Sequence, residues 1–289
     1  MLILTFVTVL WAFSFSLIGV YLAADVDPYI AVFIRMLLAT ALLLPFLRVR
    51  NLSAMYALKL AGIGAVQIGV MYILLYHAFL FLSVPEVLLF TIFTPLYITL
   101  LDEMFINRSP IPALWWVAAA LSVVGAAVIR YAQPSGDFWF GFLLIQAANL
   151  TFAAGQVAYK RFAKNNPRQQ FHEYALFFIG ALIVSGVGSV LFADWSRLPT
   201  STTHWAVLLW LGVGASGVGY LLWSMASKRV NIAQLATMNN LLIPGGILVN
   251  VVVWRSSLAW PQFISGAVII IIAIVLAGKI QRNGKLGGL

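Results

Sequence analysis

The 289-residue chain has no cysteine and very little charge. The absence of cysteine excludes disulfide bonds, thiolate metal sites and cysteine nucleophiles. Charged residues make up only 9% of the chain, whereas hydrophobic residues make up 63% and the mean hydropathy is +1.00. A soluble domain carries about 25% charged residues. The composition therefore excludes a water-soluble enzyme and predicts an integral membrane protein.

The motifs of hydrolysis, metal binding and ATP use are also missing. The sequence contains no HExxH pattern and no Walker motif, and His77, His172 and His204 lie far apart along the chain. Such motifs place ligands or phosphate-binding groups at fixed spacings. We therefore expect no enzymatic activity, no cofactor and no bound metal.

Long apolar runs predict an all-α protein with ten transmembrane helices. A helix needs about 20 apolar residues to cross the hydrocarbon core. The joints between the runs are too short to hold a soluble domain. The predicted spans are residues 2–22, 28–47, 57–81, 85–101, 112–130, 138–159, 172–193, 205–227, 232–254 and 260–279.

Basic residues gather in alternate joints and thereby predict the topology. Lys and Arg outnumber Asp and Glu by 17 to 8, but this excess lies between apolar runs, so we expect no nucleic-acid partner. One set of joints carries 13 basic residues and the other carries three, Arg130, Arg197 and Arg255. By the positive-inside rule, both termini lie in the cytoplasm. We expect a multi-pass protein of the inner membrane, in contact with lipid.

The two halves of the chain resemble each other. With a shift of 148 residues, Gly69 meets Gly217 and Tyr72 meets Tyr220. Five spans per half make the second copy enter the membrane from the opposite face, as in many secondary transporters; a chance match of Gly- and Ala-rich runs is the alternative. We predict a five-helix repeat at 1–132, its inverted copy at 137–281 around a central cavity, and a cytoplasmic tail at 282–289.

Polar and aromatic side chains recur on single faces of several predicted helices. Polar groups in lipid usually face a protein interior or a wet cavity. The alternative is hydrogen bonding between helices, worth about 0.6 kcal/mol per contact. We expect the substrate cavity to be lined by Trp11, Gln67, Tyr72, Tyr76, His77, Thr91, Thr94, Tyr97, Asn149, Gln156, Tyr220, Trp223, Asn239 and Asn240.

Two prolines lie near the middle of their predicted spans. Pro95 and Pro244 each remove a backbone donor and expose a carbonyl one turn earlier. Interrupted helices at corresponding positions of two halves point to a midplane binding site. We expect both prolines to act as hinges; a simple packing kink is the alternative.

One arginine falls inside a predicted span and needs a partner, because a buried charge is costly in lipid. Arg35 lies within the second span, and Glu86, Asp25 and Asp27 are acids near the same end of the bundle. A structural ion pair between Arg35 and one of these acids is the favoured interpretation. A site for the carboxylate of a substrate is the alternative.

Several residues are similar to those of the drug/metabolite transporter superfamily, in particular its EamA-type ten-helix exporters. They are Trp11, Arg35 after Asp27-Pro28, Tyr76-His77-Ala78-Phe79, Pro85-Glu86-Val87, Pro95 and Gly125. The Glu86-Val87…Pro95 spacing most resembles the aromatic amino acid exporters of that superfamily. The second half departs from the pattern, with Asn149-Leu150-Thr151-Phe152 where Trp11 should recur and Gln234 in the place of Glu86.

The resemblance implies export of small solutes by alternating access, and the cavity residues are neutral and aromatic. We therefore expect a monomeric secondary transporter of neutral organic solutes, with aromatic and other hydrophobic amino acids as substrates. A proton-coupled antiporter of drugs or quaternary amines, using Glu86, is the alternative within transport. A receptor or assembly protein without transport is the alternative from another class.

Overall fold

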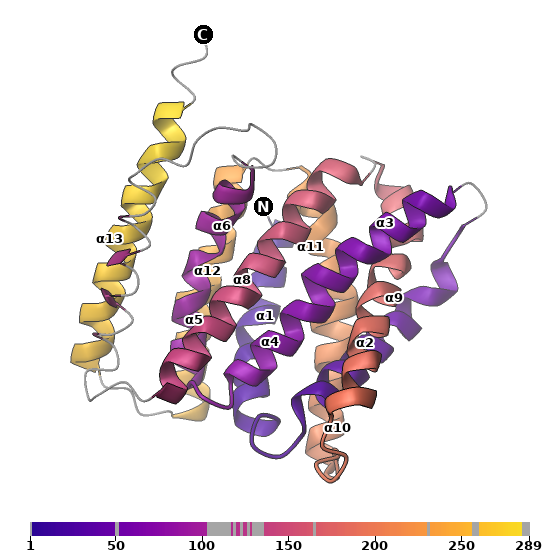
Figure 1. The fold of residues 1–289 in the computed structure, drawn as a ribbon, viewed down its shortest axis with the longest axis horizontal. Helices are drawn as coiled ribbons and strands as arrows, with labels where there is room; N and C mark the ends of the chain where they lie inside the picture. The colour runs from indigo at the N-terminus through magenta and orange to yellow at the C-terminus, as the bar shows by residue number, and fades with distance from the viewer. Residues whose placement is uncertain are drawn as a thin grey trace.

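The computed structural model describes residues 2–49, 52–102, 136–163, 166–229, 232–255 and 260–284, together with isolated positions between 117 and 128. Every regular element in these ranges is helical (Figure 1). The first part contains α1 (Leu2–Tyr21), α2 (Pro28–Leu43), η1 (Leu44–Phe46), α3 (Ala54–Gly64), η2 (Ala65–Val70), α4 (Met71–Ala78), α5 (Val84–Phe90), η3 (Thr91–Phe93) and α6 (Thr94–Asp102). The second part contains α8 (Gly136–Phe162), α9 (Pro167–Phe192), α10 (Thr202–Leu209), η5 (Trp210–Val218), α11 (Gly219–Ser227), α12 (Ile232–Trp254) and α13 (Trp260–Gly284).

Six helices are long and apolar enough to cross a membrane, counted over the described residues alone. The chain is thus an all-α membrane protein with several spans. Nine of the ten predicted runs coincide with helices, and the fifth, 112–130, falls mainly outside the described residues. The six are Leu2–Tyr21, Pro28–Phe46, Ala54–Ala78, Asp137–Phe162, Pro167–Phe192 and Thr202–Ser227.

Two spans contain a π-helical segment at corresponding positions. The segment η2 covers Ala65–Val70, and η5 covers Trp210–Val218. The shift of 148 residues found in the sequence carries the first segment onto the second. π-Bulges are rare and occur mostly at functional sites. This correspondence favours the proposal that the two halves are repeats of one five-helix unit.

The two prolines expected at hinges differ in their surroundings. The helix that holds Pro95 is interrupted by the 3-10 turn η3, directly before α6. Pro244, by contrast, lies inside α12, which runs unbroken from Ile232 to Trp254, and it is exposed. The helix is therefore not interrupted at Pro244, because neighbouring turns of a helix absorb a proline without ending it. The hinge role of both prolines stays a prediction.

Two joints at one end of the bundle are tied together. The carboxylate of Asp27 caps α2 by accepting from the amides of Tyr29 and Ile30, and it also accepts from the amide of Asp194 at 3.1 Å. Arg197 donates to the carbonyl oxygens of Ala23 and Ala24. The joint before α2 is thereby linked to the joint after α9. The Asp27 carboxylate thus both caps α2 and connects the two loops.

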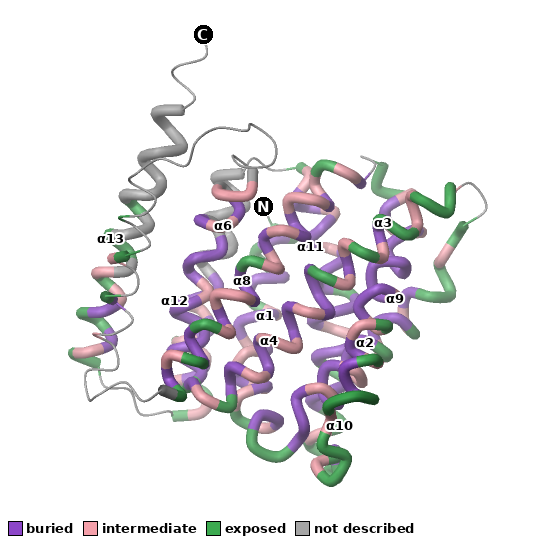
Figure 2. The backbone as a smooth tube through the Cα atoms, in the orientation of Figure 1, coloured by how far each residue is buried: buried purple, intermediate pink, exposed green. Residues whose placement is uncertain are grey.

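The helices α3 and α9 cross with their backbones in direct contact. A Cβ atom added at Gly64 would overlap the carbonyl of Phe177, and one added at Gly180 would overlap the carbonyl of Ala61. Small residues let membrane helices approach this closely. The contacting residues Gly64, Phe177 and Gly180 are buried, whereas α3 also carries exposed residues (Figure 2).

We expect Gly64→Ala to destabilise the protein by about 1–3 kcal/mol, as overpacking of a tight core usually does. Gly62→Ala is the matched control, because a Cβ at Gly62 on the same helix meets no atom within 4 Å. Thermal unfolding in detergent measures both variants. Equal stability of the two would show that the crossing is not tight.

Candidate substrate cavity

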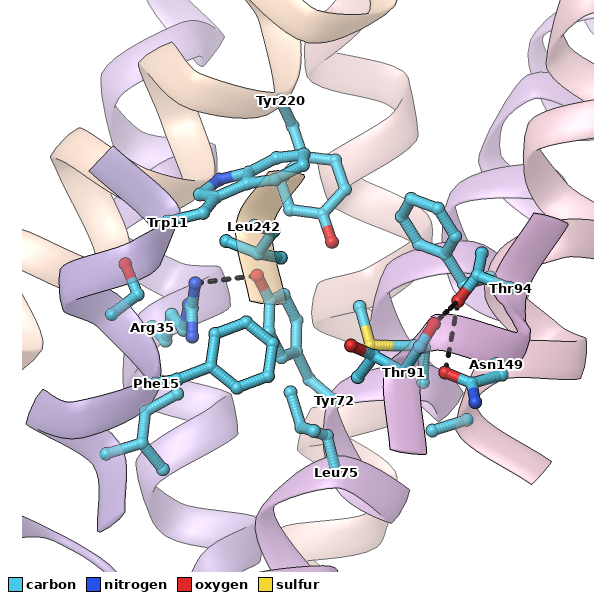
Figure 3. A pocket seen from close by; sticks show the side chains of 15 residues that line it. Trp11, Phe15, Arg35, Tyr72, Leu75, Thr91, Thr94, Asn149, Tyr220 and Leu242 are labelled. Carbon is cyan, nitrogen blue, oxygen red and sulfur yellow. Dashed lines mark hydrogen bonds between the residues drawn. The ribbon is translucent and has the colours of Figure 1, made fainter. Parts of the chain in front are cut away.

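A cavity lies between the helices of both parts of the chain, with about 690 Å³ of space between atoms when its open mouth is included. Figure 3 shows the lining side chains converging from α1, α2, α4, η3, α6, α8, α11 and α12. They are Trp11, Ser14, Phe15, Ile18, Arg35, Met71, Tyr72, Leu75, Thr91, Thr94, Ala148, Asn149, Phe152, Tyr220 and Leu242.

Arg35 brings a positive charge to one side of this cavity. Its side chain is only 1% exposed. Nη2 donates to the hydroxyl of Tyr72 at 2.6 Å, Nη1 donates to that of Tyr76 at 3.2 Å, and Nε donates to Ser216 Oγ at 2.6 Å. The guanidinium carbon also lies 3.8 Å from the centre of the Tyr72 ring. The group is held by hydroxyls from α4 and η5.

The predicted ion pair of Arg35 with an acid was wrong. All three hydrogen bonds from the Arg35 guanidinium go to neutral hydroxyl groups, and none of the described carboxylates pairs with it. Glu86 instead closes a capping box, accepting from the amide and the hydroxyl of Ser83 at 2.8 Å. Asp25 lies 3.5 Å from His204. Glu86 thus lies in the first turn of α5, where free backbone amides attract a carboxylate.

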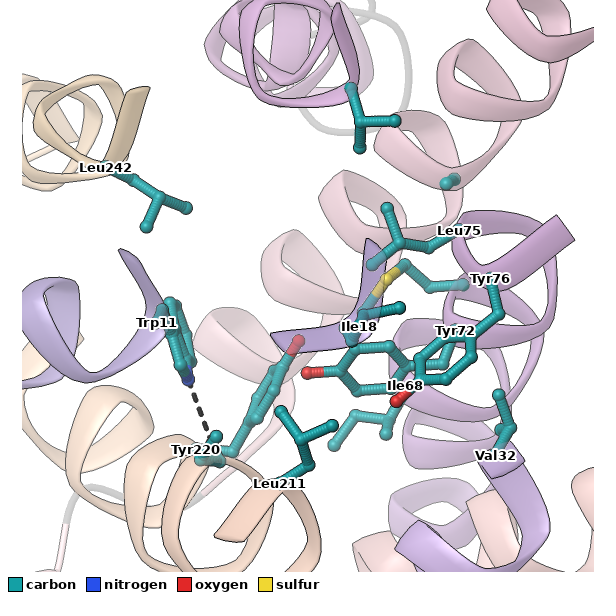
Figure 4. Packing of buried hydrophobic residues seen from close by; sticks show 14 of the residues in the cluster. Trp11, Ile18, Val32, Ile68, Tyr72, Leu75, Tyr76, Leu211, Tyr220 and Leu242 are labelled. Carbon is teal, nitrogen blue, oxygen red and sulfur yellow. Dashed lines mark hydrogen bonds between the residues drawn. The ribbon is translucent and has the colours of Figure 1, made fainter. Parts of the chain in front are cut away.

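Aromatic rings form one wall of the cavity. The indole nitrogen of Trp11 donates to the carbonyl of Ala215 in η5 at 2.9 Å (Figure 4). Its ring lies 4.8 Å from that of Tyr220, which in turn lies 6.0 Å from Tyr72 and 6.4 Å from Phe152. Such tilted and edge-to-face arrangements are favourable for aromatic pairs. The wall offers flat apolar surface from α1, α4, α8 and α11.

Amide and hydroxyl groups form a neutral polar cluster on another side. Asn149 Nδ2 donates to the carbonyl of Phe90 at 2.8 Å, and Thr94 Oγ1 lies 3.2 Å from Asn149 Oδ1. Thr94 Oγ1 also donates to the carbonyl of Thr91 at 2.8 Å. That carbonyl is the one that Pro95 cannot bond, because proline has no N–H. The interrupted helix thus supplies polar groups to the cavity.

Some residues expected in the cavity lie elsewhere. The Tyr76 hydroxyl accepts from Arg35, and Tyr76 itself is not among the lining residues. The Tyr97 hydroxyl donates to Gln146 Oε1, and His77 Nδ1 donates to the carbonyl of Ile73 at 2.7 Å. Gln67, Gln156 and Trp223 are buried but do not line the cavity. The side chains of Asn239 and Asn240 fall outside the described part of the structure. Of the predicted residues, the structure brings together Trp11, Tyr72, Thr91, Thr94, Asn149 and Tyr220, with Arg35 beside them.

Apolar lining residues were missed in the sequence. Phe15, Leu75 and Phe152 follow Trp11, Tyr72 and Asn149 by three or four positions, so they share a helical face with a residue that was found. The three- or four-residue spacing from these predicted residues could therefore have identified them as lining residues. Among the described residues, no three His, Asp or Glu side chains gather where they could hold a metal ion.

An all-helical membrane bundle with a cavity of aromatic and polar side chains between its two parts is the architecture of a multi-pass carrier. The EamA-like transporter family model matches residues 1–131 and 139–278. The chain therefore belongs to the EamA-like transporter family, within the drug/metabolite transporter superfamily. It is a secondary transporter and not an enzyme.

Relatives of known name are similar over nearly the whole chain. A protein called biotin transporter in Salmonella typhimurium is 44% identical over 279 residues, and one in Escherichia coli strain K12 is 43% identical over 281; each alignment covers 95% of this chain and 91% of the relative. A protein called probable biotin transporter in Pseudomonas aeruginosa is 44% identical over 274 residues, covering 94% and 95%. These names do not support the expected likeness to aromatic amino acid exporters.

A solved crystal structure shares the fold. It aligns with a TM-score of 0.66 at 17% identity, covering 97% of this chain and 98% of the other. The similarity at this low identity concerns the arrangement of helices alone.

We expect Gln156→Leu to raise the free energy of unfolding by about 1–3 kcal/mol, the cost of an unsatisfied buried polar group. Both polar atoms of the Gln156 side chain lack a hydrogen-bond partner in the described structure. Tyr174→Phe should instead lower stability, because the buried hydroxyl of Tyr174 bonds the carbonyl of Tyr220 and Ser224 Oγ. Thermal unfolding of purified protein gives both signs. A less stable Gln156→Leu variant would mean that this amide has a polar partner.

Proposed function

We propose that this chain carries biotin across the membrane through the cavity between its two halves. The support is the similarity to proteins called biotin transporters, which extends over about nine-tenths of each chain at 43% to 44% identity. An alignment of this extent covers nearly the whole chain. The proposal concerns the substrate; the transporter class comes from the family.

The chemistry of the cavity suits a small molecule that is mostly apolar and carries a few polar groups. Biotin has a fused bicyclic ring with a neutral ureido group and a flexible acid side chain. The rings of Trp11, Phe15 and Tyr220 can pack against its apolar body, and Asn149 and Thr94 offer hydrogen bonds. Sites of this kind combine apolar walls with a small number of placed polar groups.

The sign of the charge in the cavity argues against both earlier candidates. Among the described lining residues, Arg35 alone carries a charge, and it is positive. An amino acid would bring an ammonium group, and a quaternary amine would bring a cation, with no described carboxylate in the lining to receive either. Glu86, which the antiporter alternative requires, is used in the capping box of α5. A monocarboxylate such as biotin fits this charge better.

The remaining features of the carrier follow from the sequence and are proposals as well. The chain lies in the inner membrane as a monomer, with both termini and the tail 282–289 in the cytoplasm, because 13 of the loop basic residues fall on that side. The repeats 1–132 and 137–281 rock against each other in alternating access. The export direction implied by the resemblance stays a prediction.

Counterflow in proteoliposomes tests the substrate. Vesicles loaded with unlabelled biotin should accumulate external labelled biotin above protein-free vesicles, and this exchange reports a carrier working in either direction. In the same assay, vesicles loaded with unlabelled phenylalanine should not accumulate external labelled phenylalanine above protein-free vesicles. Vesicles loaded with tetraphenylphosphonium should likewise not accumulate labelled tetraphenylphosphonium. Exchange of phenylalanine without exchange of biotin would overturn the proposal and restore amino acid transport.

We expect Glu86→Gln to leave biotin counterflow unchanged at every pH tested. Glutamine at this position still serves a capping box, so the start of α5 should persist. Counterflow between pH 6 and 8, with thermal unfolding as the control for folding, measures the effect. A folded variant that had lost transport, or a change in its pH profile, would favour the proton-coupled antiporter.

A further inference from the structure

Arg35 retains donors that the protein does not use. A guanidinium has five N–H groups, and the structure assigns one each from Nε, Nη1 and Nη2 to Ser216, Tyr76 and Tyr72. One N–H therefore remains on each terminal nitrogen. Paired N–H groups of this kind match the two oxygens of a carboxylate.

The charge of Arg35 also lacks a counterion. All three of its partners are neutral hydroxyls, and no described acid pairs with it. The residue is nevertheless only 1% exposed. Buried charges in proteins are normally paired, because removing them from water is costly. The side chain lines the cavity, so an anion bound there would lie next to the guanidinium. An anion bound in the cavity would supply the missing charge.

The cavity has a second polar region of a different kind. Figure 3 shows Arg35 on one side and Thr91, Thr94 and Asn149 on the other, with Phe15, Tyr72 and Leu75 between them. The Asn149 and Thr94 side chains contain both donors and acceptors and have no charge. The cavity is therefore divided into a cationic end, an apolar middle and a neutral polar end.

We infer that Arg35 binds the carboxylate of the substrate and that the Thr94–Asn149 cluster binds its uncharged polar group. Applied to biotin, which rests on the function proposed above, the acid side chain points toward α2 and the ureido ring toward α6 and α8. The transported species is then the anion. A neutral analogue of the same shape should bind poorly because it leaves the buried charge of Arg35 unpaired.

The inference predicts a reversal of selectivity. Wild-type protein should bind biotin about 10- to 100-fold more tightly than biotinamide, the range expected for hydrogen bonds to a charged group. Arg35→Gln should lose this preference and bind biotinamide at least as well as biotin, whereas Arg35→Lys should keep it. Asn149→Leu is the matched control: it should weaken binding of both compounds and keep the preference for the acid. The affinities of the wild type and the three variants for both compounds are measured from the ligand-induced shift in thermal unfolding temperature.

A measurement on the wild type covers the case in which Arg35→Gln does not fold. Affinity for biotin should fall as the pH drops through the carboxyl pKa of the ligand, near 4 to 5 as for other carboxyl groups, and affinity for biotinamide should not follow. A folded Arg35→Gln that still prefers biotin, or a wild type that binds both compounds equally, would overturn the inference.

The two proposals fail in different ways. If the wild type neither binds nor transports biotin, the substrate assignment is wrong. Lipoic acid and phenylpropionic acid, each compared with its amide, then test Arg35 on its own. A preference for the acid that is lost in Arg35→Gln would support the role of Arg35, and equal binding of acid and amide would exclude it.

Discussion

A single guanidinium group, sealed from water and lipid, determines how the centre of this bundle is arranged. Lipid offers no hydrogen bonds, so the protein has to satisfy the group itself. Tyr72 and Tyr76 from α4 and Ser216 from η5 converge on Arg35 for this reason. The contacts tie α2 to elements from both parts of the chain, and they fix the Tyr72 ring as a wall of the cavity. Hydroxyls hold the charge in place without neutralising it.

The rest of the cavity follows from two irregularities in its helices. The π-helical η5 presents the carbonyl of Ala215 to Trp11, and this bond orients the indole against Tyr220. At the 3-10 turn η3, side-chain donors reach backbone oxygens, with Asn149 donating to the carbonyl of Phe90 and Thr94 Oγ1 to that of Thr91. Regular helices satisfy their backbone groups internally, so binding groups arise where the regular pattern stops. The two halves contribute unequally: the charge, Trp11, Thr91 and Thr94 come from the first half, and Asn149 comes from the second.

The sequence predicted the positions of the spans, and about half of the residues expected in the cavity do line it. Both results have a physical reason. Apolar runs of membrane length leave few alternatives to a helix, and Tyr72, Asn149 and Tyr220 lie on the polar faces of theirs. The partner of Arg35 could not be predicted, because it depends on which helices cross. Gln67 lies in the π-helical η2 and packs against Gly155 of α8, away from the cavity lining, a contact that the sequence pattern does not specify. The substrate is not determined by such patterns, and only the named relatives suggested biotin.

The direct contact of α3 with α9 limits how this carrier can move. The two helices come from different halves of the chain, and with Gly64 and Gly180 against carbonyl groups they cannot slide past each other without first separating. They can still tilt about the point where they touch. If the two halves rock as proposed, the pivot would lie at this contact, and displacement would grow with distance from it. In Figure 1, α6, α12 and α13 lie on the far side of the bundle from this contact, so they would move furthest.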